Sequence, residues 1–97
     1  MFETLFAPDS IALIGASATP GKLGYSLLAN LVNSEYRGKI FPVNPKTAEI
    51  LGQKAFSSVS KIEESVDLAV IAIPAEAVSG VLEECGQKRI QNINHDL

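Results

Sequence analysis

Residues 10–24, SIALIGASATPGKLG, decide the fold because an apolar run passes directly into a glycine-rich turn. The run SIALIGA is apolar and β-branched, which is typical of a strand buried on both faces of a parallel sheet. We expect it to be the central strand. The helix after the turn should start at Thr19, a capping hydroxyl, and Pro20, a favourable first helical residue. Its apolar face is formed by residues at helical spacing, namely Leu23, Leu27, Leu28, Leu31 and Val32.

The spacing of the glycines argues against two common phosphate-binding loops. A P-loop needs a lysine followed by a serine or threonine, whereas Lys22 is followed by Leu23. A dinucleotide fingerprint needs two glycines one residue apart, whereas Gly15 is followed by Ala16 and Ser17. The turn still suits an anionic ligand, because unpaired amides and the dipole at a helix N-terminus both favour negative charge.

Two further apolar segments extend the predicted sheet. A second strand is expected over residues 39–43, after a turn at Gly38, and a third over residues 66–73, ended by Pro74. A helix should follow the third strand, because apolar residues recur there at positions i, i+3, i+4 and i+7: Val78, Val81, Leu82 and Cys85. Alternating strands and helices predict an α/β fold, a parallel sheet with flanking helices.

The remaining segments carry weaker signals. Between residues 47 and 66 we expect a short strand around residues 54–56 and a brief helix capped by Ser60. Residues 89–97, RIQNINHDL, contain too many amides for another buried strand. We therefore expect a domain at residues 1–88 and a divergent tail at 89–97. The sheet would be C-terminally incomplete, as in a truncated or fragmentary domain, with an open edge beside the third strand that invites self-association.

Composition restricts the classes of partner. The 97-residue chain has a net charge of −3 and no basic run, so no nucleic-acid or membrane-surface partner is expected and any basic site must be local. No apolar stretch approaches a membrane span, and the N-terminus does not resemble a signal peptide, so a cytoplasmic location is the simple inference. One cysteine and one histidine cannot form an intramolecular disulfide or a typical structural zinc site.

Three segments should meet at the carboxyl ends of the strands, where open α/β sheets bind ligands. They are the glycine-rich turn, the sequence VNPK at residues 43–46 and the sequence IPAE at residues 73–76. A dinucleotide-binding protein usually presents an acid after the second strand, whereas this chain has Asn44, Pro45 and Lys46. A cation there favours a nucleotide with an additional phosphate over NAD.

The stretches at residues 6–31, 38–56 and 66–78 resemble, in this order, the CoA-binding domain of ADP-forming acyl-CoA synthetases and, more distantly, the succinyl-CoA synthetase alpha subunit. The linked motifs are IGAS-x-x-PGK-x-G, PVNPK and DLAVIAIPA. The resemblance implies a Rossmann-like fold that binds coenzyme A, with a site formed by the loop around Ser17, by Lys46 and by residues 73–75. The expected ligand-binding residues are Gly15, Ala16, Ser17, Pro20, Gly21, Lys22, Gly24, Asn44, Lys46, Ile73, Pro74 and Ala75.

The resemblance also implies what this chain lacks. Such ligases join an acid to CoA through an acyl phosphate and a phosphohistidine, with an ATP-grasp domain in the same or a partner chain. His95 lies in the divergent tail, so the phosphohistidine role is not carried over to it. We expect a binding module without catalytic residues of its own, the N-terminal part of an acetate–CoA type ligase, which presents the CoA thiol to an acyl phosphate held by other domains.

Other interpretations stay open at this point. The same motifs would serve a stand-alone CoA-binding regulatory protein or a remnant without function, and an NADP-binding oxidoreductase domain is disfavoured by the long loop. Gly21 and Gly24 could serve only turning and close packing. Cys85 is expected in the core, and Glu83 and Glu84 on a solvated helix face.

Overall fold

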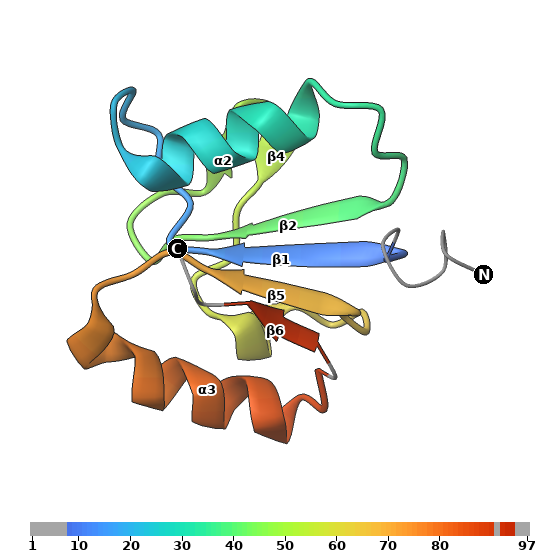
Figure 1. Cartoon of the computed structure of the whole chain (residues 1–97), viewed down its shortest axis with the longest axis vertical. Coiled ribbons are helices and arrows are strands. Elements are labelled where there is room, and N and C mark those ends of the chain that lie inside the picture. Colours follow the sequence, from blue (N-terminus) through green and yellow to red (C-terminus); the bar gives the residue numbers. More distant parts are fainter. Residues whose placement is uncertain (1–7, 91, 95–97) are drawn as a thin grey trace.

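A parallel four-stranded sheet forms the middle layer of the computed structural model, which describes residues 8–90 and 92–94. The strand order is β2–β1–β5–β6, with bounds Lys39–Val43, Ser10–Ile14, Leu68–Ile71 and Asn92–Asn94. Helices α2 (Leu23–Val32) and α3 (Val78–Gln87) cover opposite faces of the sheet (Figure 1). The expected α/β fold, a Rossmann-like parallel sheet with flanking helices, is confirmed.

Strand β1 is the central strand that its apolar run predicts. It pairs in parallel with β2 on one side and with β5 on the other. All of its residues are buried, and Ala12 and Leu13 have no exposed surface. An apolar run without alternation is required here because both faces of the strand lie under helices.

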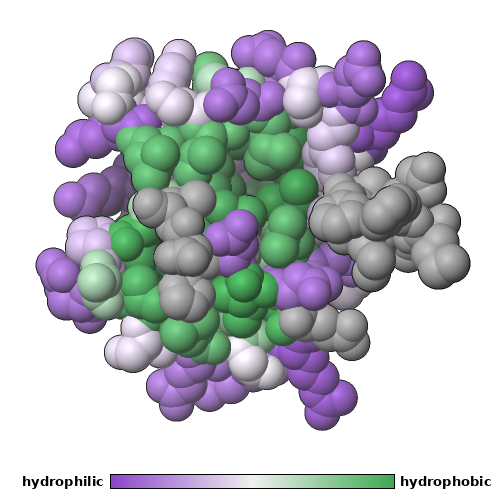
Figure 2. All heavy atoms as spheres, in the orientation of Figure 1, coloured by the Kyte–Doolittle hydropathy of each residue, from purple (hydrophilic) through white to green (hydrophobic). Residues whose placement is uncertain are grey.

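The sheet separates two apolar cores, because successive side chains of a strand point to opposite faces. Ala12 and Ile14 face the α3 side and pack with Phe41, Val59 and Ile71. Cys85 of α3 belongs to the same core, and its side chain is fully buried as expected. Leu13 faces the α2 side and packs with Leu28. Figure 2 shows apolar side chains gathered between the two helices, with polar residues around them. Among the described residues, no helix is both long and apolar enough to span a membrane.

Helix α2 begins later than the sequence predicts. Its first residue is Leu23 and its N-cap position is Lys22, so the expected start at Thr19 and Pro20 is wrong. The Lys22 N–H donates to the Thr19 carbonyl (3.2 Å) and closes a turn, and Gly21 within it has φ +94°. A positive φ is incompatible with a right-handed helix, so the helix forms only after this glycine.

The segment between β2 and β5 holds short elements. Strands β3 (Glu49–Ile50) and β4 (Gln53–Lys54) form a hairpin, so the strand expected at residues 54–56 ends earlier, although Phe56 bridges Val43 of β2. The expected helix capped by Ser60 is instead one 3₁₀ turn, η1 (Val59–Lys61), with Ser58 at its N-cap position. A second 3₁₀ turn, η2 (Ala75–Ala77), leads into α3.

The expectation that no strand follows α3 is wrong, because β6 pairs in parallel with β5 and covers its outer edge. Arg89, at φ 66°, closes a Schellman turn in which the Ile90 N–H donates to the Cys85 carbonyl (3.1 Å). In β6 only Ile93 packs against the core, and its neighbours are exposed. A three-residue edge strand therefore needs a single apolar side chain, which is why its amides misled the prediction. Residues 91 and 95–97 of the expected tail, including His95, lie outside the described residues.

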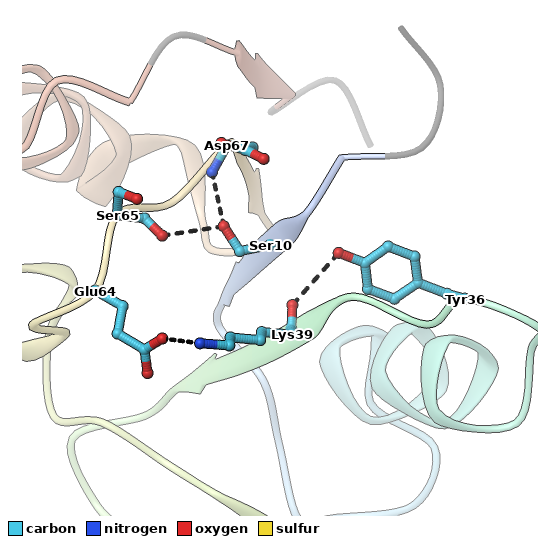
Figure 3. A network of polar contacts seen from close by, with 6 residues as sticks. All are labelled: Ser10, Tyr36, Lys39, Glu64, Ser65 and Asp67. Atoms are coloured by element: carbon cyan, nitrogen blue, oxygen red, sulfur yellow. Dashed lines mark hydrogen bonds and ion pairs between the residues drawn. The ribbon is translucent and has the colours of Figure 1, made fainter. Parts of the chain in front are cut away.

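A polar network joins the amino ends of the strands, opposite their carboxyl ends (Figure 3). The buried Ser10 hydroxyl donates to the Ser65 carbonyl and accepts from the Asp67 N–H, both at 3.0 Å. These bonds tie the start of β1 to the segment that leads into β5. Lys39, at the start of β2, forms an exposed ion pair with Glu64, which contributes little to stability because solvent screens it.

Tyr36 closes the same end of the sheet. Its hydroxyl donates to the Lys39 carbonyl (3.5 Å). Burial raises the pKa of Tyr36 above its ordinary value of 10.0, and the charges of Asp67 and Asp9 raise it further. The folded chain therefore holds the phenolic proton more tightly than an unfolded chain does.

Candidate ligand-binding site

The carboxyl ends of β1, β2 and β5 open into a cavity of about 760 Å³, the size of typical small-molecule sites. Its wall combines the three segments that the sequence predicts. The expected residues that line it are Gly15, Ala16, Ser17, Lys22, Gly24, Asn44, Lys46, Ile73 and Pro74. Pro20, Gly21 and Ala75 are not among the lining residues. They are exposed, the first two in the turn before α2 and the third in η2.

Two glycines bring backbone segments into close approach at the floor of the cavity. Gly15 has φ +97°, and a Cβ atom there would lie 2.3 Å from the Ala72 carbonyl oxygen. A Cβ atom on Gly24 would lie 1.9 Å from the Gly15 carbonyl oxygen. The first turn of α2 can therefore rest directly on the end of β1 because Gly24 lacks a side chain, and the turn after β1 can approach the end of β5 because Gly15 lacks one.

This packing places the N-terminus of α2 at the cavity. The first N–H groups of any helix have no partner within the helix, and the dipole gives this end partial positive charge. The first turn of α2 contains no acidic residue that would offset that charge, and Lys22 stands at the N-cap position. With Lys46 on the loop after β2, the α2 side of the cavity is suited to an anionic ligand.

Asn44 braces the two loops at this side. Its Nδ2 donates to the Ala16 carbonyl (2.8 Å), and its Oδ1 accepts from the Lys46 N–H (2.7 Å). The side chain expected to contact the ligand thus holds the glycine loop and the Lys46 loop together. Ser17 Oγ accepts from the Thr19 N–H (3.0 Å), which leaves its hydroxyl proton to donate to a ligand.

The sequence did not indicate the far side of the cavity. Ser57, Ser58 and Val59 line it from the segment around η1, and Val81 and Glu84 line it from α3. The expectation that Glu84 lies on a freely solvated helix face is therefore wrong. The Glu84 side chain is half-buried and accepts a hydrogen bond from Ser60 Oγ (2.9 Å). The available signal was its position three residues after Val81, on the same face of α3.

Cys85 follows Glu84 but points into the core. Burial raises the pKa of its thiol above the ordinary value of 9.0, and the Glu84 charge raises it further. A thiol held protonated in the core is a poor nucleophile, so the cavity has no reactive sulfur from this residue.

Comparison with known proteins agrees with this arrangement. The model of the CoA binding domain matches residues 9–94. The chain belongs to the CoA binding domain family. This match confirms the resemblance drawn from the motifs, and it extends across α3 to β6.

Two relatives of this CoA-binding domain are ADP-forming ligases. The chain is 53% identical over 93 residues to acetate–CoA ligase [ADP-forming] I subunit alpha of Pyrococcus furiosus, and covers 20% of it. It is 50% identical over 84 residues to acetate–CoA ligase [ADP-forming] of Methanocaldococcus jannaschii, and covers 12% of it. These alignments include 92% and 87% of the chain.

A solved structure shows the same fold. The dinucleotide forming acetyl-coenzyme A synthetase 1 of Ca. Korarchaeum cryptofilum, in complex with phosphate and ADP, superimposes with a TM-score of 0.89 at 39% identity. The superposition covers 96% of this chain and 20% of that one. The CoA-binding domain thus corresponds to a fifth or less of the length of these three proteins.

Proposed function

We propose that this domain binds coenzyme A in the cavity at the carboxyl edge of the sheet. The observation that carries the proposal is the convergence of the glycine loop, the Lys46 loop and the Ile73–Pro74 segment on one cavity in a chain of the CoA binding domain family. CoA combines a diphosphate, a 3′-phosphate and a long uncharged arm. A site for CoA therefore needs cations for the phosphates and an apolar wall for the arm. Because the chain carries a net charge of −3, these cations must be local.

We assign the phosphate groups to the α2 side. The N-terminus of α2, Lys22 and the Ser17 hydroxyl would bind the diphosphate, since they present donors and positive charge without an opposing acid. Lys46 would bind the 3′-phosphate. Both lysines are exposed, so the electrostatic part of the affinity should weaken as salt increases.

We assign the arm of CoA to the wall formed by Ile73 and Pro74 at the end of β5. In a longer ligase the domain would then present the thiol to an acyl phosphate held by other domains or by a separate ATP-grasp subunit. The identity to ADP-forming ligases supports this role as the N-terminal part of an acyl-CoA ligase. No residue of the cavity is assigned a catalytic step.

Calorimetric titration tests the proposal. Purified chain is titrated with CoA, dephospho-CoA and NADP, and the Lys46→Glu variant is compared with Arg37→Glu. Arg37 lies before β2, at the opposite end of the sheet from the cavity, and its reversal changes the net charge equally. The proposal is supported if CoA binds saturably and dephospho-CoA binds more weakly. The Lys46→Glu variant should also bind CoA more weakly than the wild type, whereas Arg37→Glu should not.

Two results would contradict it. A folded chain that binds no CoA excludes the function, and tighter binding of NADP than of CoA indicates an oxidoreductase-type domain. Circular dichroism on each sample establishes whether the chain is folded.

A further inference from the structure

The cavity is electrostatically uneven across the sheet edge. Lys22 and Lys46 lie at the α2 side and on the loop after β2, whereas Glu84 enters from α3, which covers the opposite face (Figure 1). Among the described residues that line the cavity, Glu84 is the single acid. A ligand that spans the cavity therefore meets cations at one side and a hydrogen-bond acceptor at the other.

The Glu84 carboxylate is held in place by a serine pair. Ser60 Oγ donates to its Oε2 (2.9 Å), and Ser60 Oγ lies 3.0 Å from Ser58 Oγ. Within the described part of the chain, no group donates to Oε1. An ionised carboxylate can only accept hydrogen bonds, so the remaining oxygen suits a donor on the ligand and repels a phosphate.

The surroundings of Glu84 suit a flat heterocycle. Val81 supplies apolar wall beside Glu84 on the same helix face, and the nearly buried Val59 backs this wall from η1, which packs against α3. Base rings bind against such apolar flanks, with polar groups at their edges for orientation.

This part of the cavity also adjoins the Lys46 loop. The Asn44 N–H donates to the Phe56 carbonyl (2.8 Å), and the Phe56 N–H donates to the Pro42 carbonyl (2.8 Å). These bonds fasten the start of the Ser57–Val59 segment beside the end of β2. A nucleoside whose 3′-phosphate is bound by Lys46 would therefore direct its base toward Glu84, while the arm leaves along Ile73 and Pro74.

We propose that Glu84 accepts a hydrogen bond from the exocyclic amino group of the adenine ring and so sets the nucleobase specificity of the site. This inference rests on the proposed binding of CoA. It makes a specific demand on the ligand: replacing the amino group by a carbonyl, as in deamino-CoA with its hypoxanthine base, sets an oxygen against the carboxylate. A site that must pair a charged acceptor rejects such an analogue.

The test compares CoA with deamino-CoA by calorimetry on the full chain. We expect the wild type to bind CoA at least roughly tenfold more tightly than deamino-CoA, because deamino-CoA loses a hydrogen bond to a charged group. Glu84→Gln should reduce the ratio of the two affinities to about threefold or less, because its amide can donate to the hypoxanthine oxygen. Glu83→Gln, with the same charge change on an exposed neighbour, should leave the ratio unchanged.

The other outcomes overturn the inference in distinguishable ways. An unchanged ratio in Glu84→Gln, including an equal weakening of both ligands, means that Glu84 contacts the arm or only supports the fold. A wild type that binds both ligands equally also overturns it. If the folded wild type binds no CoA, the proposed function fails together with the inference. Adenosine 3′,5′-bisphosphate should show the same Glu84 dependence as CoA, since it carries the base without the arm.

Discussion

Replacing Gly24 by alanine should destabilise the domain, because the new Cβ atom would meet backbone. It would lie 1.9 Å from the Gly15 carbonyl oxygen and 3.1 Å from the Ala16 Cα atom. Cβ atoms essentially never approach other atoms within 3.0 Å, so the end of β1 and the start of α2 must separate by about 1 Å. Neither side can yield by a rotation of a flexible side chain.

The magnitude follows from two opposing effects. Overpacking a well-packed interior typically costs about 1–3 kcal/mol, and a rigid backbone contact belongs at the upper end of this range. Alanine gains about 1 kcal/mol over glycine in a helix. The net loss should be about 2 kcal/mol, which lowers the melting temperature of a domain of this size by roughly 8–16 °C.

Gly80→Ala is the matched control. Gly80 lies in α3, is exposed, and a Cβ atom there would have no neighbour within 4 Å. Only the propensity gain remains, so this variant should be stabilised by up to about 1 kcal/mol. Urea unfolding and thermal melts followed by circular dichroism measure both variants. A Gly24→Ala variant as stable as the wild type would refute the packing argument.

Three further predictions concern the ends of the elements. Arg89→Gly should stabilise the domain by about 0.5–1 kcal/mol, because glycine adopts the left-handed conformation without strain; urea midpoints below wild type would contradict this. Ser10→Ala should cost about 1–2 kcal/mol, because the Asp67 N–H and the Ser65 carbonyl lose their partner; an unchanged midpoint would show that water replaces it. Since the pKa of Tyr36 is raised in the folded chain, the free energy of unfolding should fall as pH rises above 10.0. For Tyr36→Phe the free energy of unfolding should fall less steeply with pH; equal slopes for the variant and the wild type would contradict the raised pKa of Tyr36.

Much of the sheet could be predicted because its strands are continuous apolar runs. The central place of β1 and the packing face of α3 follow from the apolar pattern, and the bounds of β2 follow from an apolar segment after the turn at Gly38. Helix starts and turns could not be predicted as well, because local conformation outweighed residue type. Thr19 and Pro20 resemble a helix start, yet the positive φ of Gly21 delays the helix to Leu23.

The route to β6 shows the same limit. A Schellman turn is usually recognised by glycine, and here the left-handed residue is Arg89, so no sequence signal marked the turn. The burial of Ile90 (6% exposed) and the packing of Ile93 hold this conformation in place. Tertiary contacts, rather than local preference, therefore place the last described strand.

The cavity was predictable where the chain itself is distinctive, in the glycine loop and around Lys46. Its α3 side was not, because Glu84 has no unusual sequence context and Ser57–Val59 belong to a segment with weak signals. Only the register of β5 and the packing of η1 against α3 bring these residues to the cavity. The spacing of Glu84 from Val81 indicates a shared helix face, but it does not show that this face reaches the cavity.

The two hydrogen bonds of the Asn44 side chain determine when the Lys46 loop becomes ordered. Because Asn44 fixes this loop to the glycine loop in the folded chain, most of its conformational entropy is lost during folding and little remains to be lost on binding. A residue that gives its amide to the protein can thus raise affinity without touching the ligand. In the proposed function, the rigidity of this loop would contribute to selectivity, since a preformed loop does not readily adjust to phosphates at other spacings.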